Sequence, residues 1–232
     1  MHRYKYLCSP VETPSMHKEI SDAIIRSQHC QRNWDLEQQI PKEDLDLLIT
    51  AATQCPSKQN VAYYKLHVIT NRDVIEQVAA QTNGFIIQRT PEFKTTINTQ
   101  VLANVLIVFE EYLDITSRMD RVRNEETRTA FIEKYDVNSA KKIRAMDQDM
   151  KLAVGVAAGY LNLTAAMMGY QTGCCSCFID IAVQQILKLE NRPILMMGIG
   201  YKDLTRNRRL HQTDDFMFPT LKKQPIKVNI ID

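Results

Sequence analysis

Several features that define other classes of protein are missing from this sequence. No apolar run approaches the roughly 20 residues that a membrane-spanning helix needs, so we expect no membrane contact. The first ten residues contain no apolar stretch of the kind found in secretory signals, which favours a cytoplasmic protein. No repeat, low-complexity tract or glycine- and serine-rich linker divides the chain, whose 232 residues suit one large domain or two small ones.

Motifs for nucleotide and metal chemistry are also missing. The chain has neither a Gly-x-Gly-x-x-Gly fingerprint nor a Walker loop, which disfavours a dinucleotide-binding domain and a nucleoside triphosphatase. The six cysteines lack the paired spacing of a zinc site, and a chain of this length can bury a core without disulfides. We therefore expect reduced thiols and no metal. A net charge of +2 is too small to predict nucleic-acid binding, although it is compatible with a local anion site.

The patterns that are present predict a mixture of helices and strands. A first helix should have Ser15 as its cap and end near Arg26, and a second should begin at Pro41 and stop before Pro56. Further elements are expected as helices over 74–80, 152–168 and 181–187, and as strands over 64–70, 101–109, 172–178 and 194–201.

Three segments in the second half of the chain have distinctive patterns. The stretch 152–168 is apolar almost all round and rich in small residues, which predicts a fully buried helix closed by a left-handed Gly169. The preceding stretch, about 115–150, is highly charged and predicts a solvated helical excursion, with a mobile lid as the alternative. The last segment, 226–231, alternates like a strand without a neighbour, so we expect it to pair with a partner subunit.

Two short segments carry the clearest functional pattern. The stretch 26–34 places Arg26, His29 and Arg32 after a helix, where cations and hydrogen-bond donors suit a phosphate group. The stretch 56–60 is a Pro-Ser-x-x-Asn turn that follows the next helix.

Both segments and the spacing between them resemble the flavin-contacting segments of the nitroreductase family, homodimeric enzymes that hold FMN at the subunit interface. With Trp34 aligned on the aromatic residue of the family motif, Arg32 matches its second basic position. Cys30 then replaces a serine, and Gln28 replaces an arginine. In the turn, Lys58 takes the place of a second serine.

Two later stretches extend the resemblance toward the flavin ring. Asn98 and Gln100 precede a buried strand, where the family places polar side chains on the pyrimidine edge of the flavin. The loop after the buried helix matches the family loop whose backbone N–H groups lie near flavin N5. By that match, Ser176 and Cys177 supply the main-chain donors, with Cys175 beside them.

A basic loop near the C-terminus completes the expected site. Arg206 and Arg208 match the basic pair that the family places on the FMN phosphate, with Arg209 as the other candidate. The cofactor-binding residues that the resemblance implies are Gln28, His29, Cys30, Arg32, Pro56, Ser57, Lys58, Asn60, Asn98, Gln100, Cys175, Ser176, Cys177, Arg206 and Arg208.

The resemblance implies a single FMN-binding domain over residues 1–232. Its fold would be α+β, a three-layer sandwich with a central, mainly antiparallel sheet flanked by helices, in an intertwined homodimer. The implied activity is an FMN-dependent oxidoreductase: NADH or NADPH reduces the flavin, which then reduces a nitroaromatic, quinone or related small acceptor by ping-pong chemistry. The flavin carries the electrons, so no catalytic side chain is expected.

Other functions stay open at this point. Relatives of the same fold dehalogenate, fragment flavin or oxidise peptide rings, and a flavin-binding protein without turnover is a further alternative. A nucleic-acid-binding module built on the basic loop is a weaker one. Cys30 and Cys177 would lie near the flavin, which raises the idea of a thiol nucleophile; without an adjacent base or cation to activate them, we favour packing of small side chains.

Overall fold

The structure, a computed structural model, describes residues 14–88, 94–112, 140–212, 214–219 and 222–231. The helices are α1 (Pro14–Arg26), α2 (Lys42–Thr53), α3 (Arg72–Ala79), α6 (Ala140–Met167) and α7 (Asp180–Leu187), and the 3-10 turns are η1 (Lys58–Asn60) and η2 (Thr99–Val101). The strands are β1 (Trp34–Asp35), β2 (Tyr64–Ile69), β3 (Phe85–Gln88), β4 (Lys94–Thr96), β5 (Val105–Glu111), β6 (Gln171–Cys175) and β7 (Pro193–Lys202).

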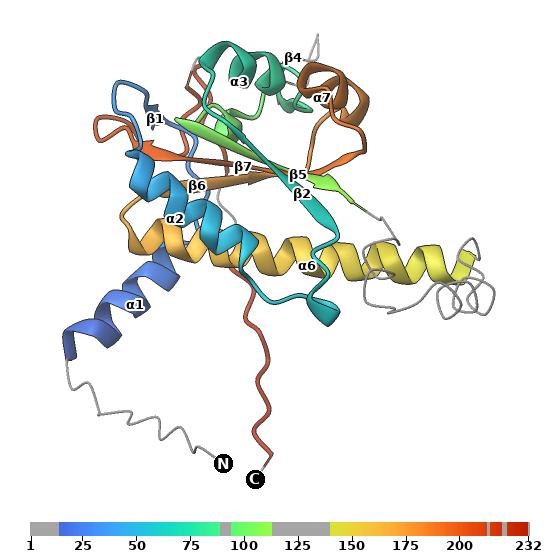
Figure 1. The fold of residues 1–232 in the computed structure, drawn as a ribbon. Coiled ribbons are helices and arrows are strands. Elements are labelled where there is room, and N and C mark those ends of the chain that lie inside the picture. Colours follow the sequence, from blue (N-terminus) through green and yellow to red (C-terminus); the bar gives the residue numbers. More distant parts are fainter. Residues whose placement is uncertain (1–13, 89–93, 113–139, 213, 220–221, 232) are drawn as a thin grey trace, which may run out of the picture.

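Five strands form one sheet with β7 in its middle (Figure 1). On one side β7 pairs with β5, which pairs in turn with β2. On its other side β7 pairs with β6 and, near its end, with β1 at Tyr201 and Lys202. All of these pairs are antiparallel, and β3 and β4 form a separate two-stranded sheet. The predicted α+β class with a mainly antiparallel central sheet is confirmed.

Helices cover both faces of this sheet, with α2 and α6 on one face and α3 and α7 on the other (Figure 1). Each face has its own buried apolar cluster. Met196 and Met197 are neighbours on β7 yet belong to different clusters, because successive side chains of a strand point to opposite faces. Ile107 and Val108 of β5 divide in the same way. The expected three-layer sandwich is therefore confirmed, with a central strand that is buried on both faces.

Two helix starts differ from the sequence signals. α2 was expected to begin at Pro41, but Pro41 is its N-cap and the helix begins one residue later, at Lys42. α1 already begins at Pro14, so Ser15 lies inside the helix and the cap prediction is wrong. Gly169 has a φ of +91°, and the Tyr170 N–H donates to Ala165 O at 2.9 Å, which closes α6 with the expected left-handed cap.

The expectation that 152–168 is buried all round is wrong for the single chain. Leu152, Val156 and Tyr160 of α6 are 62%, 39% and 49% exposed. A Cβ atom added at Gly155 or Gly159 would meet nothing within 4 Å, so none of the described residues approaches this face closely. The small and apolar residues of α6 thus serve two faces, of which the described part of the chain covers one.

α6 contains a stretch that is longer and more apolar than we expected from the sequence, which predicted no segment of membrane-spanning length. Between Met146 and Met167 it is long and apolar enough to cross a membrane, judged by length and composition alone. Of this stretch 44% is buried inside the protein, where α6 packs against α1, α2 and the sheet. A core helix of a folded domain passes the same test.

Two other expected elements differ from the prediction or lie outside the description. The segment 226–231 is extended and exposed, with Ile226 at 77% and Ile231 at 94%, and it forms no strand with the described residues of its own chain. Its pairing with a partner subunit stays a prediction. Of the expected charged excursion, 113–139 lies outside the described residues, and 140–150 forms the first turns of α6.

Candidate functional site

A basic pocket lies between the turn that follows α1 and the loop that follows β7. It encloses about 320 Å³ and none of its lining residues is Asp or Glu. We call it the Arg32 pocket. Its lining residues are Gln28, His29, Cys30, Arg32, Arg208, Arg209, Pro219 and Lys223. The structure therefore brings together all four expected residues of the first segment and one expected arginine of the basic loop.

Arg32 is held in place on two sides. Its Nη1 donates a hydrogen bond to Asn98 Oδ1 at 3.1 Å, and its guanidinium lies 3.9 Å from the centroid of the Phe218 ring. Burial lowers the pKa of Arg32, and although Cys30 opposes this shift, the positive charge of Arg208 lowers the pKa further. An arginine still keeps its proton under such conditions, so the pocket contains a positioned, partly desolvated cation.

The side chain of Asn98 forms its hydrogen bonds with other residues of the protein. Besides accepting from Arg32, its Oδ1 caps η2 by accepting from the Gln100 N–H at 3.3 Å, and its Nδ2 contacts Cys175 Sγ at 3.1 Å. The turn η2 can lie directly on the sheet because β7 has a glycine beneath it: a Cβ at Gly198 would lie 2.2 Å from Gln100 O. Close approach of backbones at this glycine thus sets the position of Asn98 and, through it, of Arg32.

The three arginines of the basic loop have different surroundings. Arg208 donates to Cys30 O at 3.3 Å, which ties the loop to the first segment. Arg209 lines the Arg32 pocket. Arg206 instead donates to Gln212 O at 2.9 Å and to His211 O at 3.0 Å, and lines a neighbouring pocket. The geometry therefore groups Arg208 and Arg209 with Arg32, whereas the sequence favoured Arg206 and Arg208.

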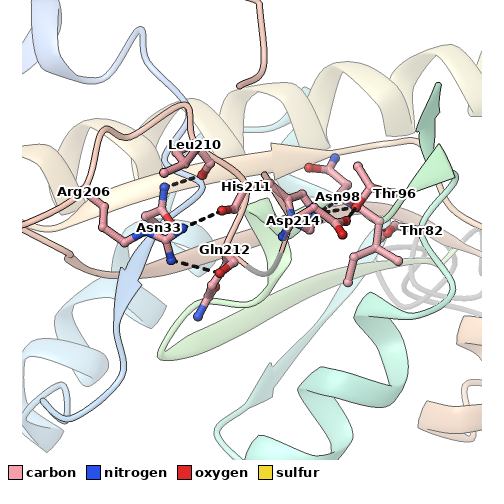
Figure 2. Close-up of polar contacts among 10 residues, drawn as sticks. Asn33, Thr82, Thr96, Asn98, Arg206, Leu210, His211, Gln212 and Asp214 are labelled. Atoms are coloured by element: carbon pink, nitrogen blue, oxygen red, sulfur yellow. Dashed lines mark hydrogen bonds and ion pairs between the residues drawn. The ribbon is translucent and has the colours of Figure 1, made fainter. Parts of the chain in front are cut away.

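His211 fastens this loop to the segment that carries Asn98 (Figure 2). The ring is fully buried, and its Nδ1 accepts from the Asp214 N–H at 2.9 Å. Because Nδ1 accepts, the neutral ring carries its proton on Nε2, which lies 3.1 Å from Ile97 O and 2.8 Å from Thr96 Oγ1. Burial lowers the pKa of His211, only partly opposed by Ile97 O and by the charge of Asp214. The imidazole is therefore neutral and forms hydrogen bonds through both of its ring nitrogens.

Two further contacts fix the loop. Asn33 Nδ2 donates to Asn207 O at 2.7 Å and to Leu210 O (Figure 2). The ring of Phe218 stacks on that of His211, with centroids 5.7 Å apart, and it also contacts the Arg32 guanidinium and the Phe216 ring. The basic loop and the first segment are thus joined by hydrogen bonds and ring contacts that leave little freedom to the cations between them.

The second expected segment lies elsewhere. Pro56, Ser57 and Lys58 line a separate pocket of about 400 Å³ against α6, which we call the Pro56 pocket. The other lining residues are Asp149, Leu152, Ala153 and Val156. Lys58 Nζ lies 2.8 Å from Asp149 Oδ2. Asn60 is exposed, with a φ of +57°. Within one chain the structure does not bring this turn to the Arg32 pocket.

The loop expected near flavin N5 has free amides. Ser176 and Cys177 are exposed, and neither N–H donates a hydrogen bond to another described residue. The neighbouring thiols are poor nucleophiles, because burial raises the pKa of Cys174 to about 12 and also raises the pKa of Cys175. Among the described residues, no cluster of three or more His, Cys, Asp or Glu side chains could hold a metal.

Two residues that line the Arg32 pocket, and the aromatic residue beside them, were not predicted from the sequence. Pro219 and Lys223 line the pocket, and Phe218 contacts Arg32. All three follow the basic loop without helical or strand periodicity, so the sequence pattern does not single them out. Their one signal is an aromatic residue next to a proline close to clustered arginines. Arg209 was considered and ranked below Arg206, since spacing along a loop does not tell which side chains converge.

The fold is that of a known class of protein. A model of the nitroreductase family matches residues 25–201, and the chain belongs to this family. A Staphylococcus epidermidis protein described as an NAD(P)H:FMN oxidoreductase has 19% identity and a TM-score of 0.62, with 89% of this chain and 92% of that chain covered. A Bacillus subtilis nitroreductase has 17% identity and a TM-score of 0.64, covering 90% and 96%.

A third solved structure, a nitroreductase from Exiguobacterium sibiricum in complex with FMN, has 16% identity and a TM-score of 0.57, covering 87% of this chain and 91% of that chain. At such identities the three similarities establish the fold. No curated protein matches this chain.

Proposed function

We propose that this protein is an FMN-dependent oxidoreductase that takes hydride from NADH or NADPH and reduces a nitroaromatic, a quinone or a related small acceptor. Membership of the nitroreductase family supports the class of chemistry. The observation that carries the proposal is the Arg32 pocket, which gathers Arg32, Arg208 and Arg209 without a single lining carboxylate. Guanidinium groups held in fixed positions are the donors that a phosphate dianion prefers, so the residues present fit the phosphate of FMN.

The remaining residues have roles that follow from their contacts. Asn98 orients Arg32, and the amides of Ser176 and Cys177 are available to donate to the ring. When bound, FMN would supply the hydride chemistry, which the side chains of this protein do not provide. The protein then binds, orients and limits access, in keeping with the raised pKa of Cys174 and Cys175, which argues against a thiol nucleophile.

We propose further that the protein works as a cytoplasmic homodimer without nucleic acid. The Pro56 turn adjoins the exposed apolar face of α6, where Leu152 and Val156 leave a surface that water solvates poorly. A second copy would cover this face and bring its Arg32 pocket toward the Pro56 turn of the first. The exposed segment 226–231 would then find a strand partner on the other subunit.

A visible absorption spectrum tests the proposal. We expect oxidised-flavin bands in the purified protein, or after addition of FMN, and we expect them to bleach anaerobically when NADH or NADPH is added. Bands that persist would indicate a flavin-binding protein that NADH and NADPH do not reduce. The neutral Gln28, which stands in the place of an arginine, favours this alternative. A protein that takes up no FMN would refute the proposal. Turnover of a halogenated aromatic but of no nitroaromatic or quinone would indicate reductive dehalogenation.

A further inference from the structure

A second basic pocket adjoins the Arg32 pocket and has no role in the function proposed above. It encloses about 340 Å³, within the size range of small-ligand sites. We call it the Lys202 pocket. Its lining residues are Arg26, His29, Gln31, Gln171, Lys202, Asp203, Leu204, Arg206 and Arg208. Four permanent cations face one carboxylate there.

The three arginines of this pocket are held by hydrogen bonds to backbone carbonyls, but no carboxylate among the described residues neutralises their charge. Arg26 donates to Ala166 O at 3.2 Å, Arg206 to two backbone carbonyls, and Arg208 to Cys30 O at 3.3 Å. Carbonyl groups orient a guanidinium without cancelling its charge. Among the described residues, neither these three arginines nor Lys202 forms an ion pair with a carboxylate.

The single acid of the pocket is already bonded. Asp203 accepts from the Thr205 N–H at 2.8 Å and from Thr205 Oγ1 at 2.7 Å. These hydrogen bonds, together with the charge of Arg206, lower the pKa of Asp203 although burial opposes them slightly. The carboxylate therefore stays ionised and offsets one of the four charges, which leaves an excess of positive charge for an anion.

The Lys202 pocket is separate from the pocket assigned to the flavin phosphate. The two share Arg208 and His29, whereas Arg32 and Arg209 line only the first and Lys202 and Arg26 only the second. FMN has one phosphate, and the Arg32 pocket alone supplies enough cations for it. A second phosphate on the other side of Arg208 would be bound by guanidinium groups that are already in place, which reduces the entropic cost of binding.

We propose that the Lys202 pocket binds the 2′-phosphate of NADPH and makes the protein prefer NADPH over NADH. This inference rests on the proposed function, because it assigns the reductant of the same site. NADH and NADPH differ in this one phosphate monoester, which proteins bind with arginine side chains. The dianion would contact Lys202 and Arg26 and share Arg208 with the flavin phosphate.

Binding can be tested apart from turnover. The protein is loaded with FMN and titrated by isothermal calorimetry with 2′,5′-ADP and, separately, with 5′-AMP, which lacks the 2′-phosphate. We expect 2′,5′-ADP to bind at least about tenfold more tightly, and the difference to shrink as salt is raised. Equal affinities would overturn the inference. Flavin uptake in the same samples reports on the proposed function, so the two can fail separately.

Variants then locate the site. Lys202 lines the Lys202 pocket and not the Arg32 pocket. The Lys202→Ala variant should therefore bind 2′,5′-ADP about fivefold more weakly, and its ratio of kcat/KM for NADPH to kcat/KM for NADH should fall by about the same factor. Its affinity for FMN should stay the same. Lys42→Ala, an exposed lysine on α2 that lines neither pocket, is the matched control and should change neither quantity. Lower FMN affinity in Lys202→Ala with an unchanged coenzyme ratio would overturn the inference, because the pocket would then serve the flavin.

Discussion

The Arg32 pocket and the Pro56 pocket contain the two segments on which the resemblance to the family was first based. Within one chain, the two pockets differ in how many distant segments line them. Around Arg32, segments more than 60 residues apart in sequence converge: Arg32 bonds to Asn98, and Arg208 bonds to Cys30. Around Pro56, the turn lies against α6 and opens onto an exposed apolar surface. We call the Arg32 pocket the closed half-site of the proposed dimer, because one chain completes it, and the Pro56 pocket the open half-site.

The two kinds of interaction explain this difference. A hydrogen bond is directional, and a buried donor without a partner costs free energy, so the basic loop needs partners within its own chain to hold its shape. Apolar contact is not directional, and the exposed side chains of α6 can be covered by any complementary surface. A ligand site made of both is therefore suited to assembly at the contact between two copies.

The largest effect should follow from a charge placed in the open half-site. Val156→Asp puts a carboxylate on the exposed face of α6, where contact with a second copy would bury it. We expect the proposed homodimer to dissociate at micromolar concentration and bound flavin to be lost, as measured by sedimentation velocity and by absorbance. Ile181→Asp, at an exposed apolar position of α7 on the opposite face of the sheet, is the control and should remain dimeric. A dimeric, yellow Val156→Asp protein would contradict the assembly.

Removal of the central cation of the closed half-site should have the next largest effect. Arg32→Ala deletes a positioned guanidinium, and we expect FMN affinity to fall by about 10- to 100-fold, corresponding to about 1.5–3 kcal/mol for a charge-assisted contact. Quenching of flavin fluorescence measures the affinity. Arg192→Ala, an arginine 50% exposed that pairs with Glu111, should leave it unchanged. An unchanged affinity in Arg32→Ala would place the phosphate elsewhere.

The link that His211 forms should make the closed half-site sensitive to acid. Burial lowers the pKa of His211 in the folded state, so below the ordinary value of about 6.5 the unfolded chain binds a proton that the folded chain does not. The contribution to stability is therefore complete above pH ~6.5 and falls as the pH is lowered toward the depressed folded-state pKa. In thermal melts from pH 8 to pH 5, wild-type Tm should fall, and part of that dependence should be missing in His211→Phe.

The same variant also tests the contacts of the ring. Phe fills the space but removes the hydrogen bonds of the ring with the Asp214 N–H and with Ile97 O, so at pH 8 we expect a loss of about 1–3 kcal/mol, or several degrees in Tm. A His211→Phe protein as stable as wild type at pH 8, with the same acid dependence, would show that the imidazole is not the link.

The smallest effect should come from Lys58. Its ion pair joins the Asp149 carboxylate, which is 11% exposed, to a lysine side chain that is 59% exposed; because the lysine stays solvated, the pair should contribute roughly 0–1 kcal/mol. We expect Lys58→Ala to change the free energy of unfolding by about 0.5 kcal/mol or less, measured by urea denaturation. A clear loss of flavin in this variant without loss of stability would instead show that Lys58 contacts the cofactor.

Much of the fold could be predicted from local patterns. The stripe of α2 after Pro41, the β-branched run of β5 and the positive φ of Gly169 all follow from spacing and residue type. The error on α6 has a physical reason: an apolar pattern tells that a face needs cover but not which chain covers it. Likewise 226–231 has the alternation of a strand, but alternation supplies no hydrogen-bonding neighbour.

The candidate site divides in the same way. Arg32 could be found because a short motif surrounds it, whereas the choice of Arg209 over Arg206 depends on which way the side chains of an irregular loop turn. That direction is set by contacts between residues far apart, such as His211 with Thr96 and Asn33 with Leu210. No periodicity in either segment encodes such a pairing.

By itself the sequence determined the order of the longer helices and strands, the family and the two clusters of basic residues, because these depend on neighbours along the chain; the short strands β1, β3 and β4 were not predicted. The tertiary structure alone decided that the clusters meet around Arg208, that Arg206 bonds to its own loop, and that the Pro56 turn stays apart. The reason is geometric: directional hydrogen bonds between segments more than 100 residues apart fix the loop, and they exist only once the sheet has brought those segments together.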